Sequence, residues 1–437
     1  MAANVETLGT LERRVSMRVE MNDIEQQVDA RLKKLAREAR MPGFRPGKVP
    51  MKLIAQTYGP QVRSEVLGDA VQKSFTEVVR DANLKVAGYP KIEPKETKEA
   101  EGGKALEFSA TFEIYPEVKP GDIAGKPIER PVVNVTDAEV DKTIEILRKQ
   151  RVRFAKAERA AQDGDRLVID FSGTIDGKPF EGGQAENFGL VLGEGRLLPE
   201  FEAGARGMKA GEKKSVEVKF PDDYQGKEVA GKQAVFEIAV KSVDAPELPA
   251  VDAEFAKQLG VADGDVAKMR AEVKANVERE VKKRVEARVK QQALQVLLDA
   301  TPFEIPKSLI EMESQELAQR AAADLQSRGI DPKQMPLNPS MFEDTAKRRV
   351  ALGLIIAELA RAESLQPKPG EVRAMVEQES QSYENPAEVV KWFYMQPQRL
   401  SEMESAALEA NVVKWVLSKA QVQDKETPFD DLMGAQS

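Results

Sequence analysis

The segment Met41-Pro42-Gly43-Phe44-Arg45-Pro46-Gly47-Lys48-Val49-Pro50 lies between two stretches whose apolar residues recur at helical spacing. Its three prolines and two glycines exclude a helix or a central strand, because proline lacks a backbone donor and glycine loses much entropy when ordered. We therefore predict a loop, which proline stiffens before any partner binds, so that less entropy is lost on binding. Its tip carries one aromatic and two cationic side chains, those of Phe44, Arg45 and Lys48.

A basic patch surrounds this loop. Residues 31–52 hold eight lysines and arginines and one acidic residue, Glu38, although the whole chain of 437 residues has a formal net charge of −8. Such a patch suits a polyanion such as RNA, whose phosphates supply affinity that weakens with salt. The alternative is that these charges form a solvated helix face, as most charge runs do.

The loop resembles the Gly-Phe-Arg-x-Gly-Lys-x-Pro signature of trigger factor, a family of bacterial ribosome-associated chaperones. The matching residues are Gly43, Phe44, Arg45, Gly47, Lys48 and Pro50. The resemblance implies a ribosome-binding loop that docks on the large subunit beside the nascent-chain exit tunnel and consists of Gly43, Phe44, Arg45, Pro46, Gly47 and Lys48. An ordinary turn remains the alternative for so short a motif.

Composition excludes several kinds of chemistry. The chain has no histidine and no cysteine, so Ser-His-Asp and Cys-His nucleophiles, thiolate or imidazole zinc sites and disulfides are impossible. We expect no metal, no cofactor and no ATP, since no phosphate-binding loop is present. The N-terminus lacks the apolar region of a signal peptide, and the longest apolar run, Val350–Ala357, is too short to span a membrane. We therefore expect a cytoplasmic protein that binds neither membranes nor DNA.

The first 115 residues are predicted to form an α+β domain. Apolar and polar residues alternate in 13–21 and 106–114, which indicates two strands with one buried face each. A helix follows the first strand and ends at the loop. After the loop, the apolar pattern predicts two helical pieces, with a break near Gly59-Pro60.

Residues 116–155 are predicted to be a connector and the first part of a helical body. Four prolines between Pro116 and Pro131 favour an extended chain. A helix is expected from Thr136 to Phe154, because Thr136 and Glu139 have the spacing of a capping box.

Residues 156–246 have the pattern of an antiparallel sheet with glycine turns. The expected strands include 167–171, 215–218 and 234–238. Asp176-Gly177 predicts a hairpin turn of the primed type. A short helix is expected at Phe201–Met208.

The order and spacing of residues in this segment resemble FKBP-type peptidyl-prolyl isomerases. The resemblance implies a catalytic proline pocket made of Phe171, Phe180, Phe188, Leu197, Leu198, Phe201, Tyr224 and Phe236. Phe201 stands where stand-alone members have tryptophan, and the flap at 224–231 is short, so the preferred proline context is expected to differ. Taken singly, a buried aromatic such as each of these is more often plain core than part of a site.

Residues 247–437 are predicted to be helical. Met269, Val273 and every fourth residue onward to Ala293 form a narrow apolar stripe that needs a partner, in a coiled-coil hairpin or a packed helical arm. Further helices are expected near 307–328, 339–364, 369–383, 386–394 and 397–421.

The sequence thus predicts a multidomain α+β protein: a ribosome-docking α+β domain, an inserted FKBP-like antiparallel sheet, and an all-α chaperone body with long helical arms. The resemblance implies ATP-independent shielding of nascent and unfolded polypeptides, isomerisation of X-Pro bonds, and a homodimer when free. Two other readings stay open. One is a ribosome- or RNA-associated binding protein whose isomerase-like module only grips peptides, and the other is a plain isomerase with a dimerising helical domain.

Overall fold

The computed structural model describes residues 5–39, 42, 44, 49–95, 105–222, 224, 226, 228–332, 337–381, 383 and 385–434. The chain divides into two units by its internal contacts. The first consists of Met1–Arg130 with Ala287–Asp424, and the second of Pro131–Glu286 with Lys425–Ser437. None of the helices within the described ranges is both long enough and apolar enough to cross a membrane.

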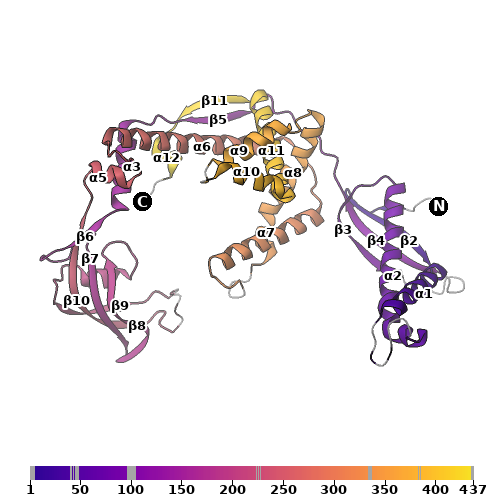
Figure 1. Ribbon diagram of the computed structural model, residues 1–437, viewed down its shortest axis with the longest axis horizontal. Helices are drawn as coiled ribbons and strands as arrows, with labels where there is room; N and C mark the ends of the chain where they lie inside the picture. The colour runs from indigo at the N-terminus through magenta and orange to yellow at the C-terminus, as the bar shows by residue number, and fades with distance from the viewer. Residues whose placement is uncertain are drawn as a thin grey trace. The chain divides into compact units, whose positions relative to one another are not determined.

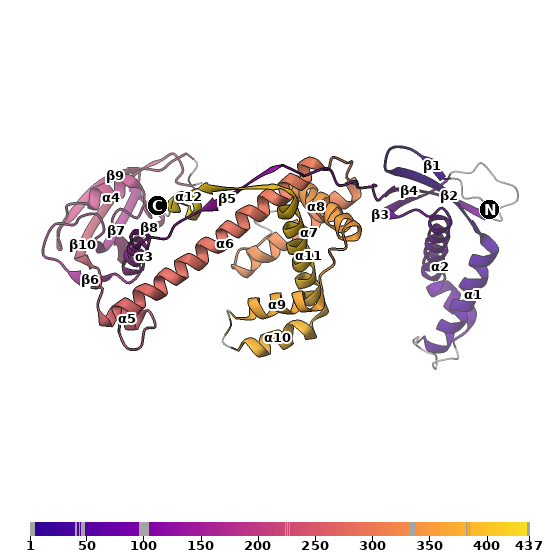
Figure 2. The same ribbon diagram turned by 90° about the horizontal axis from the view of Figure 1, so that it is seen from above.

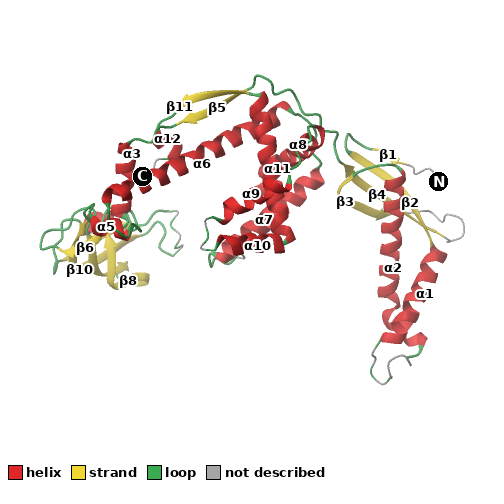
Figure 3. Ribbon diagram, turned by 45° about the horizontal axis from the view of Figure 1, so that its top comes forward, coloured by secondary structure: helices red, strands yellow, loops and turns green. Residues whose placement is uncertain are grey.

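The first unit begins with a four-stranded antiparallel sheet and two helices (Figure 1). Its elements are β1 (Val5–Thr7), β2 (Glu12–Glu20), α1 (Met21–Glu38), α2 (Met51–Asp81), β3 (Val86–Pro94) and β4 (Ala105–Ile114). The strand order is β1-β2-β4-β3, and the two helices pack on one face of the sheet (Figure 3). The predicted strands at 13–21 and 106–114 are confirmed to within one residue. The predicted loop falls between α1 and α2, and most of its residues lie outside the described part of the chain.

Helix α2 corrects the prediction of a break near Gly59-Pro60, because it runs without interruption through both residues. Proline inside a helix costs about 3 kcal/mol through the missing donor and a steric clash. The cost is offset by one continuous buried face, to which Ile54, Val62 and Phe75 contribute. Propensity is a weak prior where such a face can be buried against a sheet.

Strand β3 was missed because its sequence contains Gly88, Pro90 and Pro94. It lies at the edge of the sheet, where proline removes no ladder hydrogen bond that the sheet needs. Its pairing with β4 shifts register between Ala87 and Lys91, which accommodates the irregular segment.

Helices make up the rest of the first unit. They are the C-terminal part of α6 (Val266–Ala300), α7 (Lys307–Ser327), the short 3-10 helix η2 (Pro339–Phe342), α8 (Glu343–Ala362), α9 (Pro369–Ser380), α10 (Pro386–Met395) and α11 (Pro397–Lys419). The five helices predicted beyond residue 307 are confirmed, each to within three residues of its predicted end.

A carboxylate from the N-terminal sheet caps the first turn of α7. Glu113 accepts hydrogen bonds from the backbone N–H of Lys307 at 3.1 Å and of Ser308 at 2.7 Å. The Ser308 hydroxyl lies 2.7 Å from a Glu113 oxygen and 2.9 Å from the Ala87 carbonyl, so its one proton serves one acceptor at a time. Gly88 has a φ of +75°, and a Cβ there would lie 2.6 Å from that of Ser308. This close approach joins the sheet to the helical region.

The second unit contains a five-stranded antiparallel sheet (Figure 2). Its elements are α3 (Asp137–Lys149), β6 (Arg153–Lys156), β7 (Arg166–Ile175), β8 (Lys178–Val191), α4 (Pro199–Ala205), β9 (Lys213–Lys219), β10 (Gln233–Glu247), α5 (Ala253–Gln258), the N-terminal part of α6, and α12 (Phe429–Met433). Strands follow the order β6-β10-β7-β8, and β9 also pairs with β10. We call this five-stranded region with α4 the sheet domain.

Two predictions in this unit that rest on only a few neighbouring residues, a hairpin turn and a helix cap, are confirmed. Asp176 and Gly177 have φ angles of +50° and +76°, which confirms the primed hairpin turn between β7 and β8. Thr136 and Glu139 form the predicted capping box. The helix ends at Lys149 and not at Phe154, because the following residues form β6 and pair with β10.

The apolar stripe of α6 is buried by three other helices. Met269, Val273, Val277 and Val281 are at most 7% exposed. The residues that cover this part of the stripe come from α3, α5 and α12, and they are Val140, Ile144, Phe255 and Leu432. The prediction that the stripe needs a packing partner is therefore confirmed.

The proline-rich connector ends in a strand, β5 (Pro127–Val132), which pairs with β11 (Gln421–Glu426).

Candidate functional site

An apolar cavity of about 560 Å³ lies on the inner face of the sheet domain. It is lined by Phe171, Phe180, Glu181, Gly182, Gly195, Arg196, Leu197, Leu198, Phe201, Val218, Phe220, Tyr224, Gly226, Glu228, Val229 and Phe236. The rings come from β7, β8, β10, α4 and the segment after β9. Cavities of this size with mainly apolar walls are where proteins hold small ligands and short peptide segments.

Seven of the eight pocket residues predicted from the sequence line this cavity: Phe171, Phe180, Leu197, Leu198, Phe201, Tyr224 and Phe236. Phe188 does not. It lies on the edge strand β8 opposite Ile169, is 36% exposed, and meets Phe171 edge-on at 5.6 Å between ring centroids. The pairing of β7 with β8 shifts register between Ile169 and Phe171.

Sequence reasoning missed Val218, Phe220 and Val229 in the cavity wall. The alternation that marked residues 215–218 as a strand continues to Phe220, so this residue could have been found by extending the pattern. Val229 follows an irregular segment and has no periodic signal.

Phe236 is the centre of the aromatic walls. Its ring lies 5.3 Å from that of Phe201 and 6.0 Å from those of Phe171 and Phe180, measured between centroids. Phe201 and Phe180 meet it nearly perpendicularly, at 83° and 89°, which is a favoured aromatic geometry. Because the rings support one another, the walls are formed before a ligand enters.

Gly173 on β7 makes room for the Phe236 ring. A Cβ at this position would lie 2.5 Å from a ring carbon of Phe236. A side chain here would displace the ring, so glycine is required by the packing of the cavity wall.

Tyr224 lies at the mouth of the cavity and is 42% exposed. Its ring packs against Phe220 at 4.9 Å, and its backbone N–H donates to the Pro221 carbonyl. No side chain or backbone group among the described residues forms a hydrogen bond with its hydroxyl. The hydroxyl is therefore available to a bound molecule.

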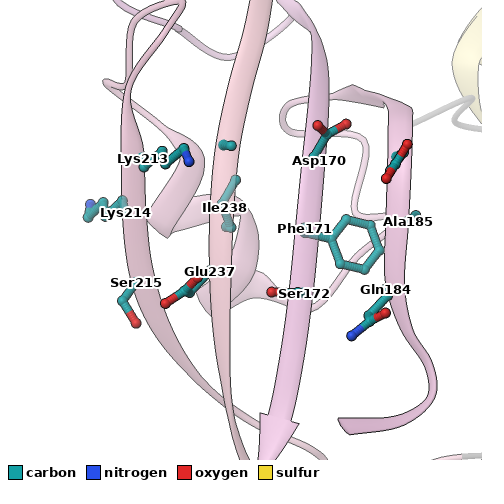
Figure 4. Close-up of a pocket in the computed structure, with 12 residues that line it drawn as sticks. Asp170, Phe171, Ser172, Gln184, Ala185, Lys213, Lys214, Ser215, Glu237 and Ile238 are labelled. Carbon is teal, nitrogen blue, oxygen red and sulfur yellow. The ribbon is translucent and has the colours of Figure 1, made fainter.

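A second cavity, of about 700 Å³, lies on the opposite face of the same sheet (Figure 4). Asp170, Ser172 and Glu237 line it, and they alternate along β7 and β10 with the residues of the aromatic cavity. Lys213 and Lys214, which are labelled in Figure 4, also line it and belong to β9. Its charged and hydroxyl side chains offer little to a proline ring, so the smaller apolar cavity is the candidate site.

An ion pair with a buried carboxylate stabilises the chain where it enters β7. Asp165 is 1% exposed and accepts two hydrogen bonds from Arg159, at 2.5 and 2.8 Å, and one from the Gln162 backbone at 2.8 Å. Burial raises the pKa of the Asp165 carboxyl, but these hydrogen bonds outweigh burial and hold the pKa below its usual value. The ionised form therefore stabilises the fold.

Because of this ion pair, we expect the free energy of unfolding to depend on pH. Because the folded pKa of Asp165 is lowered, its contribution is present above about pH 4, the pKa in an unfolded chain, and is lost as the pH falls through the folded value. Asp165→Asn should lower the free energy of unfolding by roughly 1–3 kcal/mol at neutral pH. The denaturant midpoints of Asp165→Asn and of the native protein should therefore differ at about pH 6 and converge as the pH is lowered to about 3.

The control for this prediction is Asp163→Asn, whose carboxylate is 61% exposed and pairs with Arg206. Exposed pairs contribute at most about 1 kcal/mol. Equal pH dependence in the native protein and Asp165→Asn would contradict the prediction.

The structure shows only part of the predicted ribosome-binding loop. Phe44 is 41% exposed, and Val49, two residues before the start of α2, is buried. Gly43, Arg45, Pro46, Gly47 and Lys48 lie outside the described residues. Within the described residues, no group of three or more acidic side chains is placed to hold a metal ion.

Comparison with known proteins covers nearly the whole chain. Residues 1–147 match the model of the bacterial trigger factor protein, residues 265–418 match that of its C-terminus, and residues 157–241 match FKBP-type peptidyl-prolyl cis-trans isomerase. A trigger factor from Aromatoleum aromaticum is 56% identical over 434 residues, covering 99% of each chain. That of Nitrosospira multiformis is 56% identical over 436 residues, covering 99% of this chain and 100% of the relative.

A solved structure of the trigger factor chaperone aligns with 95% of this chain and 99% of that chain, at 18% identity and a TM-score of 0.46. The high identity to these relatives over their full length establishes the family that the loop motif and the isomerase-like segment suggested. The chain belongs to the trigger factor family, and it is a ribosome-associated chaperone with peptidyl-prolyl cis-trans isomerase activity.

Proposed function

We propose that the aromatic cavity is the site at which this chaperone isomerises X-Pro bonds. The single observation that supports the assignment is the mutually packed ring set around Phe236, open to solvent beside Tyr224. In this proposal the rings of Phe171, Phe180 and Phe201 hold the pyrrolidine ring, while Leu197 and Leu198 form an aliphatic wall. Phe188 supports Phe171 from outside the cavity.

The reaction suits a site without a nucleophile. Prolyl isomerisation breaks no covalent bond and crosses a barrier of about 18–20 kcal/mol that arises from amide resonance. An apolar cavity disfavours the polar planar amide relative to the twisted one, which has less charge separation. The Tyr224 hydroxyl and a nearby backbone amide would hold the substrate carbonyl during rotation, so that the twisted state is bound more tightly than the planar state.

Phe201→Ala tests this assignment. Loss of the ring at the floor of the cavity should reduce catalysis of a proline-limited refolding reaction by about a hundredfold or more, since misplaced contacts cost factors of this order. Prevention of aggregation of an unfolded, proline-free protein should persist. Unchanged isomerase activity would overturn the cavity assignment, and lost prevention of aggregation would place chaperoning in the sheet domain.

We propose that successive segments of the chain have different functions. Residues 1–115 would dock on the ribosome, 116–155 would connect and begin the helical body, 156–246 would isomerise, and 247–437 would bind unfolded chains. The matched family segments follow the same order. Helix α10 supports the last assignment, because Trp392, Tyr394 and Met395 are 42%, 46% and 80% exposed, and exposed apolar side chains suit loose binding of unfolded polypeptides.

The segment Gly43–Lys48 is our proposed contact with the large ribosomal subunit, including its RNA. Changing Phe44, Arg45 and Lys48 together to alanine should abolish co-sedimentation with ribosomes at low and moderate salt, because one apolar anchor and two phosphate contacts are removed. If the native and altered proteins pellet equally with ribosomes, the loop is an ordinary turn and does not bind the ribosome.

We propose that the protein is a cytoplasmic homodimer when it is not bound to the ribosome. Sedimentation of the free protein would test the dimer.

A further inference from the structure

Glu202 is a buried acid in the short helix beside the cavity. Helix α4 places Phe201 in the cavity wall, and the next residue, Glu202, is only 6% exposed. Glutamate is almost never buried to this extent unless its carboxylate is paired. No lysine or arginine forms an ion pair with Glu202 in the described parts of the chain. Its carboxylate must therefore be stabilised by hydrogen bonds.

The two carboxylate oxygens bind two points of one loop. Oε2 accepts from the backbone N–H of Gly193 at 3.1 Å, and Oε1 accepts from that of Leu197 at 3.4 Å. This loop joins β8 to α4, and Gly193 and Gly195 have positive φ angles of +88° and +67°. Since the loop has no regular secondary structure, the carboxylate is the group that ties both its ends to α4.

The tied segment is also a wall of the cavity. Gly195, Arg196, Leu197 and Leu198 all line it, and they lie between the Gly193 anchor and the start of α4. A shift of this loop would therefore move one whole wall relative to the aromatic rings, which are fixed by their own packing.

We propose that Glu202 is a positioning residue for prolyl isomerisation, which holds the Gly193–Leu198 loop so that Leu197 and Leu198 meet the substrate. This inference rests on the proposed isomerase site. Glu202 itself does not touch the substrate. Because it preorganises a binding wall, its loss should weaken substrate binding more than it slows rotation in the bound state.

The test uses the full chain and a chromogenic tetrapeptide with one X-Pro bond, with kcat and KM measured separately. Glu202→Ala should lower kcat/KM by about tenfold to a hundredfold, mainly through KM, and should speed hydrogen exchange at the Gly193 and Leu197 amides. Glu202→Gln keeps one acceptor oxygen, so it should restore protection of one amide and give an intermediate KM. Glu200→Ala, an exposed acid on the same helix, is the matched control and should match the native protein.

The outcomes separate this inference from the site assignment. If Phe201→Ala is inactive but Glu202→Ala and Glu202→Gln keep the native KM and protected amides, Glu202 has no positioning role and the inference fails alone. If Phe201→Ala is active, the cavity assignment fails. If Glu202→Ala also loses protection from hydrogen exchange in β7 and β10, the variant has unfolded and Glu202→Gln becomes the test. A native KM in Glu202→Gln, with the Gly193 and Leu197 amides both protected, would then overturn the proposal.

Discussion

Replacing Phe236 with alanine is expected to lower the free energy of unfolding of the sheet domain by about 3–5 kcal/mol. The side chain is 6% exposed and packs against the rings of Phe171, Phe180 and Phe201. Its removal loses the buried area of a large ring and leaves a cavity beside an existing one. The edge-on geometry of the ring pairs with Phe180 and Phe201 is lost as well.

Hydrogen exchange in the full chain measures this effect domain by domain. Amides of β7 and β10 should lose protection by the corresponding factor, while those of α2 and α8 stay unchanged. The matched control is Val235→Ala, the neighbouring residue on the opposite face of β10, which is 40% exposed and should change stability by less than about 1 kcal/mol. Native protection in Phe236→Ala would show that the rings repack without it.

Gly121→Ala is expected to destabilise the first unit strongly. A Cβ at this position would lie 1.8 Å from the backbone carbonyl oxygen of Ala300, at the end of α6. The same glycine donates its N–H to the Thr301 hydroxyl at 3.1 Å. Overpacking costs about 1–3 kcal/mol where side chains can move, and occasionally more. Here the obstacle is backbone, so the cost should reach or exceed the upper end of that range.

Gly353→Ala is the control, because nothing lies within 4 Å of the added Cβ in α8. It should stabilise the helix by up to about 1 kcal/mol, since alanine has the higher helix propensity. Thermal unfolding of the two variants should thus shift in opposite directions. A Gly121→Ala protein as stable as the native one would mean that the connector moves away from α6 without loss.

Short-range features of the sequence determined much of this fold. The Asp176-Gly177 turn and the Thr136 capping box depend on a few neighbouring residues whose backbone preferences are strong. Alternation predicted strands β2 and β4, and the spacing of apolar residues predicted the stripe on α6. The ring set was predicted through the resemblance to FKBP-type isomerases, which implied the residues of the proline pocket.

Tertiary structure decided the elements whose local signals conflict with their environment. Helix α2 passes through Pro60 because a buried face repays the lost hydrogen bond. Strand β3 tolerates its prolines only because it is an edge, and β5, β6 and β11 are short strands stabilised by partners distant in sequence. Phe188 does not line the cavity, although the sequence resemblance placed it there, and the Glu202 contacts to Gly193 and Leu197 have no sequence signal. Such pairings depend on long-range contacts, whose free energy no local pattern records.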